Sequence, residues 1–154
     1  MRIGTVAALG GGVVLGLVAA AWSVGAPIAA AGPESARQFG LCHRGGGTNC
    51  VVDGDTFWMD GTKIRIADID APETHPSRCA EEARLGDAAT LRLQALLSAG
   101  PVTLAPADRD TDRYGRKLRI VMRGNVSLGD MLVSEGLARH WTGRRQPWCQ
   151  AHPE

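Results

Sequence analysis

Hydrophobic and polar residues follow a strand-like pattern over residues 50–59 and 62–69, where β-branched and aromatic side chains are frequent. The Asp-Gly dipeptide at 60–61 separates these two runs and is typical of a hairpin turn. A second Asp-Gly dipeptide, at 53–54, lies inside the first run and indicates a bulge or a sharp bend. The pattern therefore predicts a β-hairpin with an irregularity near its start.

Residues 78–99 change to helical spacing, with one apolar face formed by Leu85, Ala89, Leu93 and Leu96. Acidic residues in the first turn and a Gly-Pro dipeptide at 100–101 are the start and stop signals of such a helix. Further on, Ser127 and Asp130 predict the cap of a short second helix, which ends at Gly136.

Three more strands are predicted, at residues 101–104, 117–122 and 137–141. About five strands with a central helix indicate an α+β domain built on a small closed β-barrel.

The first 33 residues carry no charge after Arg2 and are rich in Ala, Gly and Val. Such a stretch is either a secretory signal peptide or an uncleaved membrane anchor. Pro27 and the glycines favour cleavage, so we expect a domain that is periplasmic or secreted. The expected organisation is a leader at 1–33, a leader loop at 34–48, the folded domain at 49–149 and a tail at 150–154.

Without the leader, the basic and acidic residues are equal in number, so the domain lacks the overall positive charge that attracts polyanions. Nucleic-acid binding would therefore depend on a local arrangement of side chains. Of the 17 basic residues, 15 are arginine, whose forked guanidinium suits phosphate and carboxylate groups. A GC-rich coding sequence would also explain this bias.

Four cysteines follow the leader: Cys42, Cys50, Cys79 and Cys149. An even number in an exported chain predicts two disulfides, for which three connectivities exist. We favour Cys42–Cys50 and Cys79–Cys149, and closing the second, longer loop would stabilise the fold by about 4 kcal/mol. A zinc site is the alternative, but the C-x-x-C spacing of structural zinc sites is absent.

The stretch DGDTFWMDGTKIRIADIDAPET, residues 53–74, crowds six carboxylates into these predicted strands. Acids this close repel one another unless solvent, basic side chains or a metal ion lies between them. Asp55 and Asp70 lie near the ends of the two runs, where hairpin pairing would bring their carboxylates together. With a backbone carbonyl they form an oxygen-only ligand set suited to calcium.

Glu73 lies in a turn just beyond Asp70 and would reach a water molecule on that ion. Arg65 and Arg116 would flank a bound anion. A metal, a carboxylate base and two guanidiniums are the groups that phosphodiester hydrolysis needs. Arg65 and Asp70 have opposite parity, so the strand must bend or end between them if both face one site.

Each of these residues also has a simpler interpretation, which is the stronger one when the residue is taken singly. Asp53 and Asp60 would serve turns, and Asp68 would be a solvated or salt-bridged strand acid. Arg116 would pair with Asp112 on the surface. The order and spacing of the motifs together change this balance.

Three motifs occur in order: D-G-D-T at 53–56, R-x4-D-A-P-E at 65–73 and D-R-Y-G-R at 112–116. This set closely resembles the thermonuclease family, the staphylococcal-nuclease-like domain, over residues 49–141. The resemblance implies a five-stranded OB-fold β-barrel with helices. It also implies a calcium-dependent endonuclease that hydrolyses DNA and RNA with low sequence specificity and leaves 3′-phosphates.

The resemblance further implies a role for each motif residue. Calcium would be bound by Asp55, Asp70 and the carbonyl of Ala71, a position where many members carry threonine. Glu73 would act as general base or orient the attacking water, while Arg65 and Arg116 would bind the phosphate and stabilise the transition state. Arg113 and Tyr114 would contact substrate phosphate.

The chain departs from the family where the final long helix would follow Trp141, and the Cys79–Cys149 bridge would substitute for that helix as a clamp. Trp141 or Trp148 would replace a base-stacking tyrosine found in some relatives, unless both serve packing.

We expect a monomeric enzyme acting on DNA, RNA or both, with a membrane tether through the N-terminus if the leader is not cleaved. The alternatives are a non-catalytic OB-fold module that binds nucleic acid and a calcium-stabilised structural module. The enzyme is favoured because a pure binder has no use for a carboxylate cluster that faces a polyanion.

Overall fold

The computed structural model describes residues 37–43 and 46–149, so the predicted leader at 1–33 and the tail at 150–154 lie outside the described residues. The strands are β1 (Gly40–Leu41), β2 (Cys50–Asp53), β3 (Thr56–Met59), β4 (Thr62–Ile66), β5 (Ile69–Asp70), β6 (Thr103–Thr111), β7 (Lys117–Arg123), β8 (Val126–Ser127) and β9 (Arg139–His140). The helices are α1 (Ala80–Ser98) and α2 (Leu128–Ser134).

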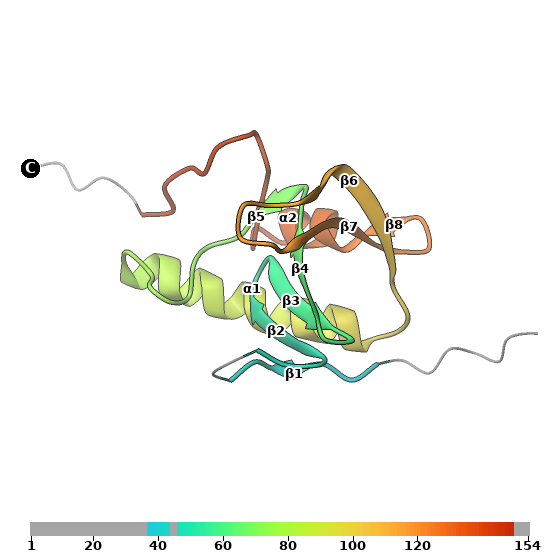
Figure 1. Ribbon diagram of the computed structural model, residues 1–154. Helices are drawn as coiled ribbons and strands as arrows, with labels where there is room; N and C mark the ends of the chain where they lie inside the picture. The colour runs from blue at the N-terminus through green and yellow to red at the C-terminus, as the bar shows by residue number, and fades with distance from the viewer. Residues whose placement is uncertain (1–36, 44–45, 150–154) are drawn as a thin grey trace, which may run out of the picture. The chain divides into compact units, whose positions relative to one another are not determined.

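Most strands belong to one mixed sheet in the order β1-β2-β3-β4-β7-β6, with β8 paired to β7 (Figure 1). β1 pairs with β2, and β4 with β7, in parallel, and the other pairings are antiparallel. β5 and β9 form a separate antiparallel pair. The domain is therefore of α+β class, with two helices and a mixed sheet in the described part of the chain.

The predicted hairpin is present between β3 and β4, where the Asp-Gly turn at 60–61 has positive φ angles at both residues, 49° and 75°. This is the backbone conformation that tight hairpin turns favour and that glycine adopts without strain. The second Asp-Gly dipeptide confirms the predicted sharp bend, because the chain reverses direction there. Residues 50–59 consequently form two antiparallel strands, β2 and β3, with a register shift before Asp53.

Gly54 lies in the β2–β3 turn, where α1 comes very close to the backbone. A Cβ atom at this position would lie 2.6 Å from the Cβ of Ala89 and 2.8 Å from that of Ala71. A side chain does not fit in this space, so the glycine of D-G-D-T allows the turn, the helix and the segment after β5 to pack together.

α1 confirms the predicted helix, with Cys79 as its cap and a buried face that includes Ala89, Leu93, Leu96 and Leu97. It packs against β2, and the apolar side chains of the sheet complete one core (Figure 1). The largest fully buried apolar residues are Val51, Phe57, Ile64, Ile66, Ile69, Leu93, Leu97, Val121, Leu128 and Leu132.

β6 continues seven residues past the predicted end of its strand at residue 104. It contains Pro106, which lacks a backbone N–H, and it lies at an edge of the sheet, where proline is tolerated. The register of β6 against β7 shifts between Pro106 and Thr111. β6 therefore continues along the sheet through this irregular stretch instead of ending before it.

α2 begins at the predicted cap, because the Ser127 hydroxyl accepts a hydrogen bond from the Asp130 backbone N–H at 3.2 Å. Gly136 follows the helix with a φ angle of 72°, as the sequence predicted. The last strand is shorter than the predicted range 137–141 and consists of β9.

The predicted leader loop at 34–48 is not only a loop, because it contains β1 and the buried ring of Phe39. That ring packs edge-on against Phe57, with 6.1 Å between the ring centroids. Two adjacent residues in β1 carry too short a pattern for periodicity to detect, and pairing to β2 selects their conformation.

The structure contains both predicted disulfides. Cys42 and Cys50 join the start of the domain to β2, with 5.0 Å between their Cα atoms. Cys79 and Cys149 join the start of α1 to the last described residue, with 6.0 Å between their Cα atoms. Neither helix in the described part of the chain is both long and apolar enough to cross a membrane.

Candidate functional site

Arg65, in β4, lies buried between two carboxylates. Its Nη1 donates a hydrogen bond to Asp55 Oδ2 at 2.7 Å, and its Nη2 lies 3.7 Å from Asp70 Oδ1. Nη2 also donates to the carbonyl of Ile69 at 3.4 Å. The side chains of all three charged residues are at most 10% exposed. We call Asp55, Arg65 and Asp70 the floor of the site.

The end of β4 explains how Arg65 and Asp70 reach the same point despite their opposite parity. β4 stops at Ile66, residues 67–68 form a bend, and β5 then starts at Ile69. The bend changes which side of the chain faces the floor, as the sequence pattern required. The Trp141 backbone N–H donates to the carbonyl of Asp68 at 2.8 Å and holds the bend against the segment after β9.

Hydrogen bonds fix the carboxylate of Asp55. The Thr56 hydroxyl donates to its Oδ1 at 2.8 Å, and the backbone N–H of Ala71 donates to its Oδ2 at 3.3 Å. Asp53, predicted to serve a turn, does so by accepting a hydrogen bond from the Asp55 backbone N–H at 3.1 Å. Two residues of the D-G-D-T motif, Asp53 and Thr56, thus help to orient the carboxylate of Asp55.

The pKa values of Asp53 and Asp70 are both raised, and burial is the largest cause in each case. Burial, together with the nearby charge of Asp55, raises the pKa of Asp53 to about 7. Burial likewise raises the pKa of Asp70, because the guanidiniums of Arg145 and Arg65 only partly offset it and Asp55 adds repulsion. Within the floor, Asp55 and Asp70 share the single guanidinium of Arg65, which balances only one of the two carboxylates.

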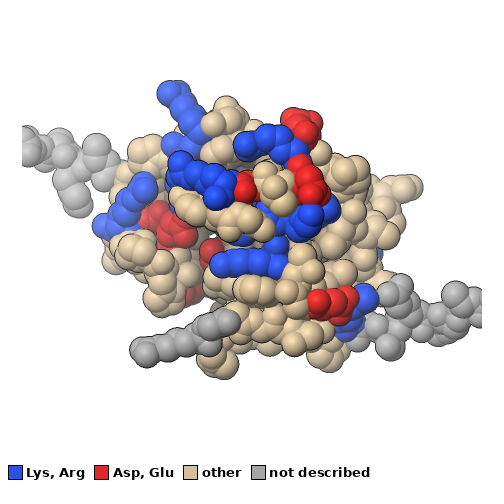
Figure 2. Space-filling model, in the orientation of Figure 1, with Lys and Arg blue, Asp and Glu red and all other residues tan. Residues whose placement is uncertain are grey.

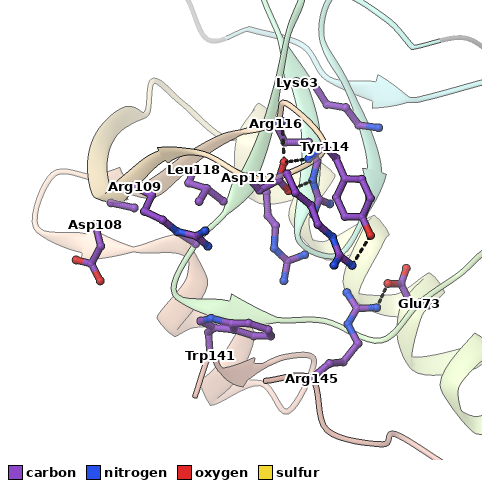
Figure 3. Close-up of a pocket in the computed structure, with 14 residues that line it drawn as sticks. Lys63, Glu73, Asp108, Arg109, Asp112, Tyr114, Arg116, Leu118, Trp141 and Arg145 are labelled. Atoms are coloured by element: carbon purple, nitrogen blue, oxygen red, sulfur yellow. Dashed lines mark hydrogen bonds and ion pairs between the residues drawn. The ribbon is translucent and has the colours of Figure 1, made fainter. Parts of the chain in front are cut away.

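Glu73 lies in the turn after β5, and its side chain is 30% exposed toward the pocket. α1 supports this turn at Gly86, where a Cβ atom would lie 3.0 Å from the carbonyl oxygens of Pro72 and Glu73. The guanidinium of Arg145 contacts the Glu73 carboxylate (Figure 3). Its Nε also lies 3.3 Å from Asp70 Oδ1. Glu73 is thus placed beside the floor.

Arg116 and Asp112 belong to the turn between β6 and β7, which we call the rim. Arg116 Nε donates to Asp112 Oδ2 at 2.7 Å, and Arg116 Nη1 donates to the Thr56 hydroxyl at 3.2 Å. Burial alone would raise the pKa of Asp112, but hydrogen bonds from Arg116 and from the Tyr114 backbone N–H hold it below its ordinary value. The surface pair in the simpler interpretation is therefore real, and it also orients Arg116 toward the floor.

Tyr114 is the exposed part of the rim, with 68% of its surface accessible. Its hydroxyl accepts a hydrogen bond from Arg113 Nη2 at 2.6 Å. The guanidinium carbons of Arg113 and Arg116 lie 4.7 Å and 5.6 Å from the ring centroid. The three side chains therefore form one cationic and aromatic surface (Figure 3).

The floor and the rim border a pocket of about 940 Å³. Its lining is strongly basic and includes Lys63, Arg65, Arg109, Arg113, Arg116 and Arg145. Figure 2 shows several Lys and Arg side chains gathered on the face in view, with acidic side chains between them. The predicted residues Arg65, Glu73, Arg113, Tyr114 and Arg116 all line the pocket, whereas Asp55, Asp70 and Ala71 lie buried behind it.

A family model described as staphylococcal nuclease homologue matches residues 63–153, which is more than half of the sequence. The chain belongs to the staphylococcal nuclease homologue family. The matched range includes Arg65, Asp70, Glu73 and Arg116 but begins after Asp55, so the place of Asp55 in the site rests on the geometry described above.

Two endonucleases of Bacillus subtilis (strain 168) are similar to this staphylococcal nuclease homologue. Endonuclease YhcR is 35% identical over 99 residues, which cover 57% of this chain and 8% of the relative. Endonuclease YncB is 35% identical over 95 residues, which cover 58% of this chain and 44% of the relative. The chain thus spans less than half of the length of either relative.

The floor of this staphylococcal nuclease homologue suits a divalent cation on chemical grounds. Both carboxylate oxygens of Asp70 are buried and accept no hydrogen bond in the described part of the chain, and Asp55 directs a second carboxylate to the same place. Within the described residues, no three or more His, Cys, Asp and Glu side chains form a metal-binding group. The predicted ligand set needs only two such side chains, because its third ligand is a backbone carbonyl.

Sequence reasoning missed Arg145, which belongs to the irregular tail after β9. The predicted Cys79–Cys149 bridge was the available signal, because it brings the tail to the start of α1 and hence near Glu73. It does not distinguish Arg145 from Arg144. Of the two tryptophans, Trp141 lines the pocket and lies 5.7 Å from the Arg65 guanidinium, whereas Trp148 stacks on Arg139 at 3.7 Å.

Proposed function

We propose that this staphylococcal nuclease homologue is an exported, calcium-dependent endonuclease that hydrolyses phosphodiester bonds of DNA, RNA or both with low sequence specificity and leaves 3′-phosphates. The observation that carries the proposal is that Arg65, Glu73 and Arg116 line one basic pocket while Arg65 contacts the buried carboxylates of Asp55 and Asp70. We further propose that its five longer strands form an OB-fold β-barrel.

Calcium would be held by Asp55, Asp70 and the carbonyl of Ala71, and when bound it would polarise the phosphate and increase the acidity of a water molecule. The buried carboxylates supply the hard oxygen ligands for this ion. Arg65 holds the Asp55 carboxylate in place through the 2.7 Å hydrogen bond. The fixed floor geometry avoids reorganisation when substrate arrives.

Arg65 and Arg116 would grip the phosphate from the floor and from the rim, and both would stabilise the negative charge that grows in the transition state. Glu73 would accept the proton of the attacking water or orient that water. The water oxygen forms a bond to phosphorus while the bond from phosphorus to the 5′-oxygen breaks. The 5′-oxygen takes up a proton, and the 3′-phosphate remains.

Arg113 and Tyr114 would contact a neighbouring phosphate of the strand. Their exposure supports this role, because they stand at the mouth of the pocket where a chain longer than one nucleotide must pass. The local cluster of arginines takes the place of an overall positive charge. Contacts to phosphate rather than to base edges account for the proposed low sequence specificity.

Export is supported by two disulfides in a chain that starts with an uncharged, apolar leader. Whether the leader is cleaved decides between a free and a membrane-tethered monomer. N-terminal sequencing of the exported protein distinguishes the two, because a cleaved form begins near residue 34.

A cleavage assay tests the proposed function. The purified protein and Glu73→Gln are incubated with single- and double-stranded DNA and RNA, in calcium or in chelator, and the product ends are mapped. We expect the wild type to cut only in calcium and to leave 3′-phosphates, and we expect Glu73→Gln to lose at least about 10²-fold in rate. Cutting that persists in chelator contradicts calcium dependence, and binding without cutting identifies the non-catalytic OB-fold module instead.

A further inference from the structure

Arg145 places a second guanidinium against the acids of the site. Its Nη1 contacts Glu73 Oε1, and its Nε lies 3.3 Å from Asp70 Oδ1. Figure 3 shows its side chain reaching up from the C-terminal segment to Glu73. One cation therefore bridges a floor carboxylate that we assign to the metal and the carboxylate that we assign to the attacking water.

The tail that carries Arg145 is fixed to the domain at both ends. Before it, the Trp141 backbone N–H donates to the carbonyl of Asp68 at 2.8 Å. On the other side, Arg139 Nη1 donates to the carbonyl of Pro147 at 3.0 Å, and the Arg139 guanidinium stacks on Trp148. After it, Cys149 is bonded to Cys79 at the start of α1. The disulfide thus brings the tail back across the pocket and holds Arg145 near the acids at a high local concentration.

The charge around Asp70 shows what Arg145 does there. Asp55, Asp70 and Glu73 are three carboxylates, and Arg65 and Arg145 are the two guanidiniums that contact them. With Arg145 in place the group has one negative charge left, whereas without it the group has two, which is the charge that a divalent cation neutralises. Arg145 therefore supplies part of the positive charge that a metal would otherwise bring.

We propose that Arg145 is an internal cation that competes with the metal ion for Asp70 and Glu73 and thereby sets the metal affinity of the site. The inference rests on the calcium site of the proposed function. Metal binding displaces the guanidinium from Asp70 and frees Glu73 for the water, while the Cys79–Cys149 bridge keeps Arg145 close enough to return. A reduced bridge weakens this competition.

The other role open to Arg145 is a direct contact with substrate phosphate. The geometry favours competition, because the guanidinium bridges Asp70, which we assign to the metal, and Glu73, which we assign to the attacking water. Arg116, which we assign to the phosphate, is instead paired with Asp112, a carboxylate that we assign to neither role. The experiment below separates the two roles.

The test is a calcium titration by calorimetry in the absence of nucleic acid. It compares wild type with Arg145→Gln, which removes the charge, and with Arg145→Lys, which keeps the charge but has fewer hydrogen-bond donors. Arg144→Gln is the matched control, because it removes the same charge from an exposed neighbour that does not line the pocket. Melting in chelator verifies that each variant is folded.

We expect Arg145→Gln to lower the calcium dissociation constant about tenfold, Arg145→Lys to lower it by less, and Arg144→Gln to leave it within about twofold of wild type. The double variant Cys79→Ser/Cys149→Ser should shift it in the same direction as Arg145→Gln. Adding Arg145→Gln to that pair should produce less than the sum of the two effects, because both changes act through one contact.

An unchanged or weaker calcium affinity in Arg145→Gln overturns this proposal. If wild type binds calcium in the same experiment, the proposed metal site itself still stands. If that variant keeps its calcium affinity but raises the KM for nucleic acid, Arg145 is a substrate contact instead. Wild type that binds no calcium overturns both this inference and the calcium dependence of the proposed function.

Discussion

The floor and the rim of the pocket each pair arginine with aspartate, but the two pairs differ in charge balance. At the rim, one guanidinium meets one carboxylate, and Asp112 Oδ1 also accepts hydrogen bonds from the backbone N–H groups of Tyr114 and Arg116. At the floor, Arg65 is shared by two buried carboxylates, and the oxygens of Asp70 accept no hydrogen bond from the described residues, although Arg145 Nε lies 3.3 Å from Oδ1.

Because of this difference, the rim pair serves to position Arg116, whereas the floor attracts a further cation. A balanced, partly exposed pair gains little from a further ion and serves to orient Arg116. Buried carboxylates without enough positive charge around them cost free energy, and a cation that binds between them lowers this cost. The comparison predicts that floor substitutions act on metal binding and that rim substitutions act on substrate and stability.

Asp70→Asn should produce the largest effect. It removes one metal ligand, so we expect kcat/KM in calcium to fall on the order of 10³-fold. The free energy of unfolding in chelator should change by no more than about 1 kcal/mol, because the ion pairs of Asp70 with Arg65 and Arg145 are offset by the cost of burying its charge. Asp108→Asn, an exposed acid that lines the same pocket, serves as the control and should retain activity. An active Asp70→Asn would remove the distinction between floor and rim.

Arg116→Gln should have the next largest effect, about 10²-fold on kcat/KM, because it removes a donor to the phosphate while leaving the metal ligands in place. Calcium affinity should remain near that of wild type. The matched change Arg119→Gln breaks the ion pair with Asp110 elsewhere on β7 and should leave the rate within about twofold. A loss of calcium binding in Arg116→Gln would show that the rim belongs to the metal site.

Asp112→Asn should reduce activity by about tenfold, because Arg116 loses the partner that orients it. It should also lower the free energy of unfolding at neutral pH by about 1 kcal/mol. A carboxylate whose pKa is lowered by folding stabilises the protein above its unfolded-state pKa, and this contribution is lost as the pH falls through the folded-state value. The stability difference from wild type, measured by urea denaturation, should therefore shrink in acid. A difference that persists unchanged at low pH would indicate a packing effect.

Tyr114→Phe should give the smallest effect, roughly a threefold increase in KM with kcat unchanged, since it removes one exposed hydroxyl that accepts from Arg113. Steady-state cleavage of a short oligonucleotide provides the measurement. A large fall in kcat would instead place this hydroxyl in the chemistry.

Local sequence patterns predicted those parts of the fold whose conformation depends on residues close together in the sequence. The Asp-Gly turn before β4, the buried face of α1 and the Ser127 cap of α2 all follow from residues a few positions apart. β1 was missed because its conformation comes from pairing with β2, and the extension of β6 was missed because Pro106 reads as a stop unless the strand is known to lie at an edge.

The residues of the site also fall into two groups, those that local sequence patterns predicted and those whose position depends on distant contacts. Parity alone showed that the chain must bend between Arg65 and Asp70, but it did not show that β4 ends one residue after Arg65. Ordered motifs identified Glu73 and Arg116. The position of Arg145 depends on a disulfide between residues 70 positions apart, and no local pattern encodes the path of the tail between its two anchors.

Calcium binding by the floor is tested most directly by calorimetric titration of wild type, Asp70→Asn and Asp112→Asn with the same protein preparations. The account predicts one calcium ion per chain in wild type and in the rim variant, and none in the floor variant. Equal calcium binding by all three proteins, or no binding by wild type, would contradict it.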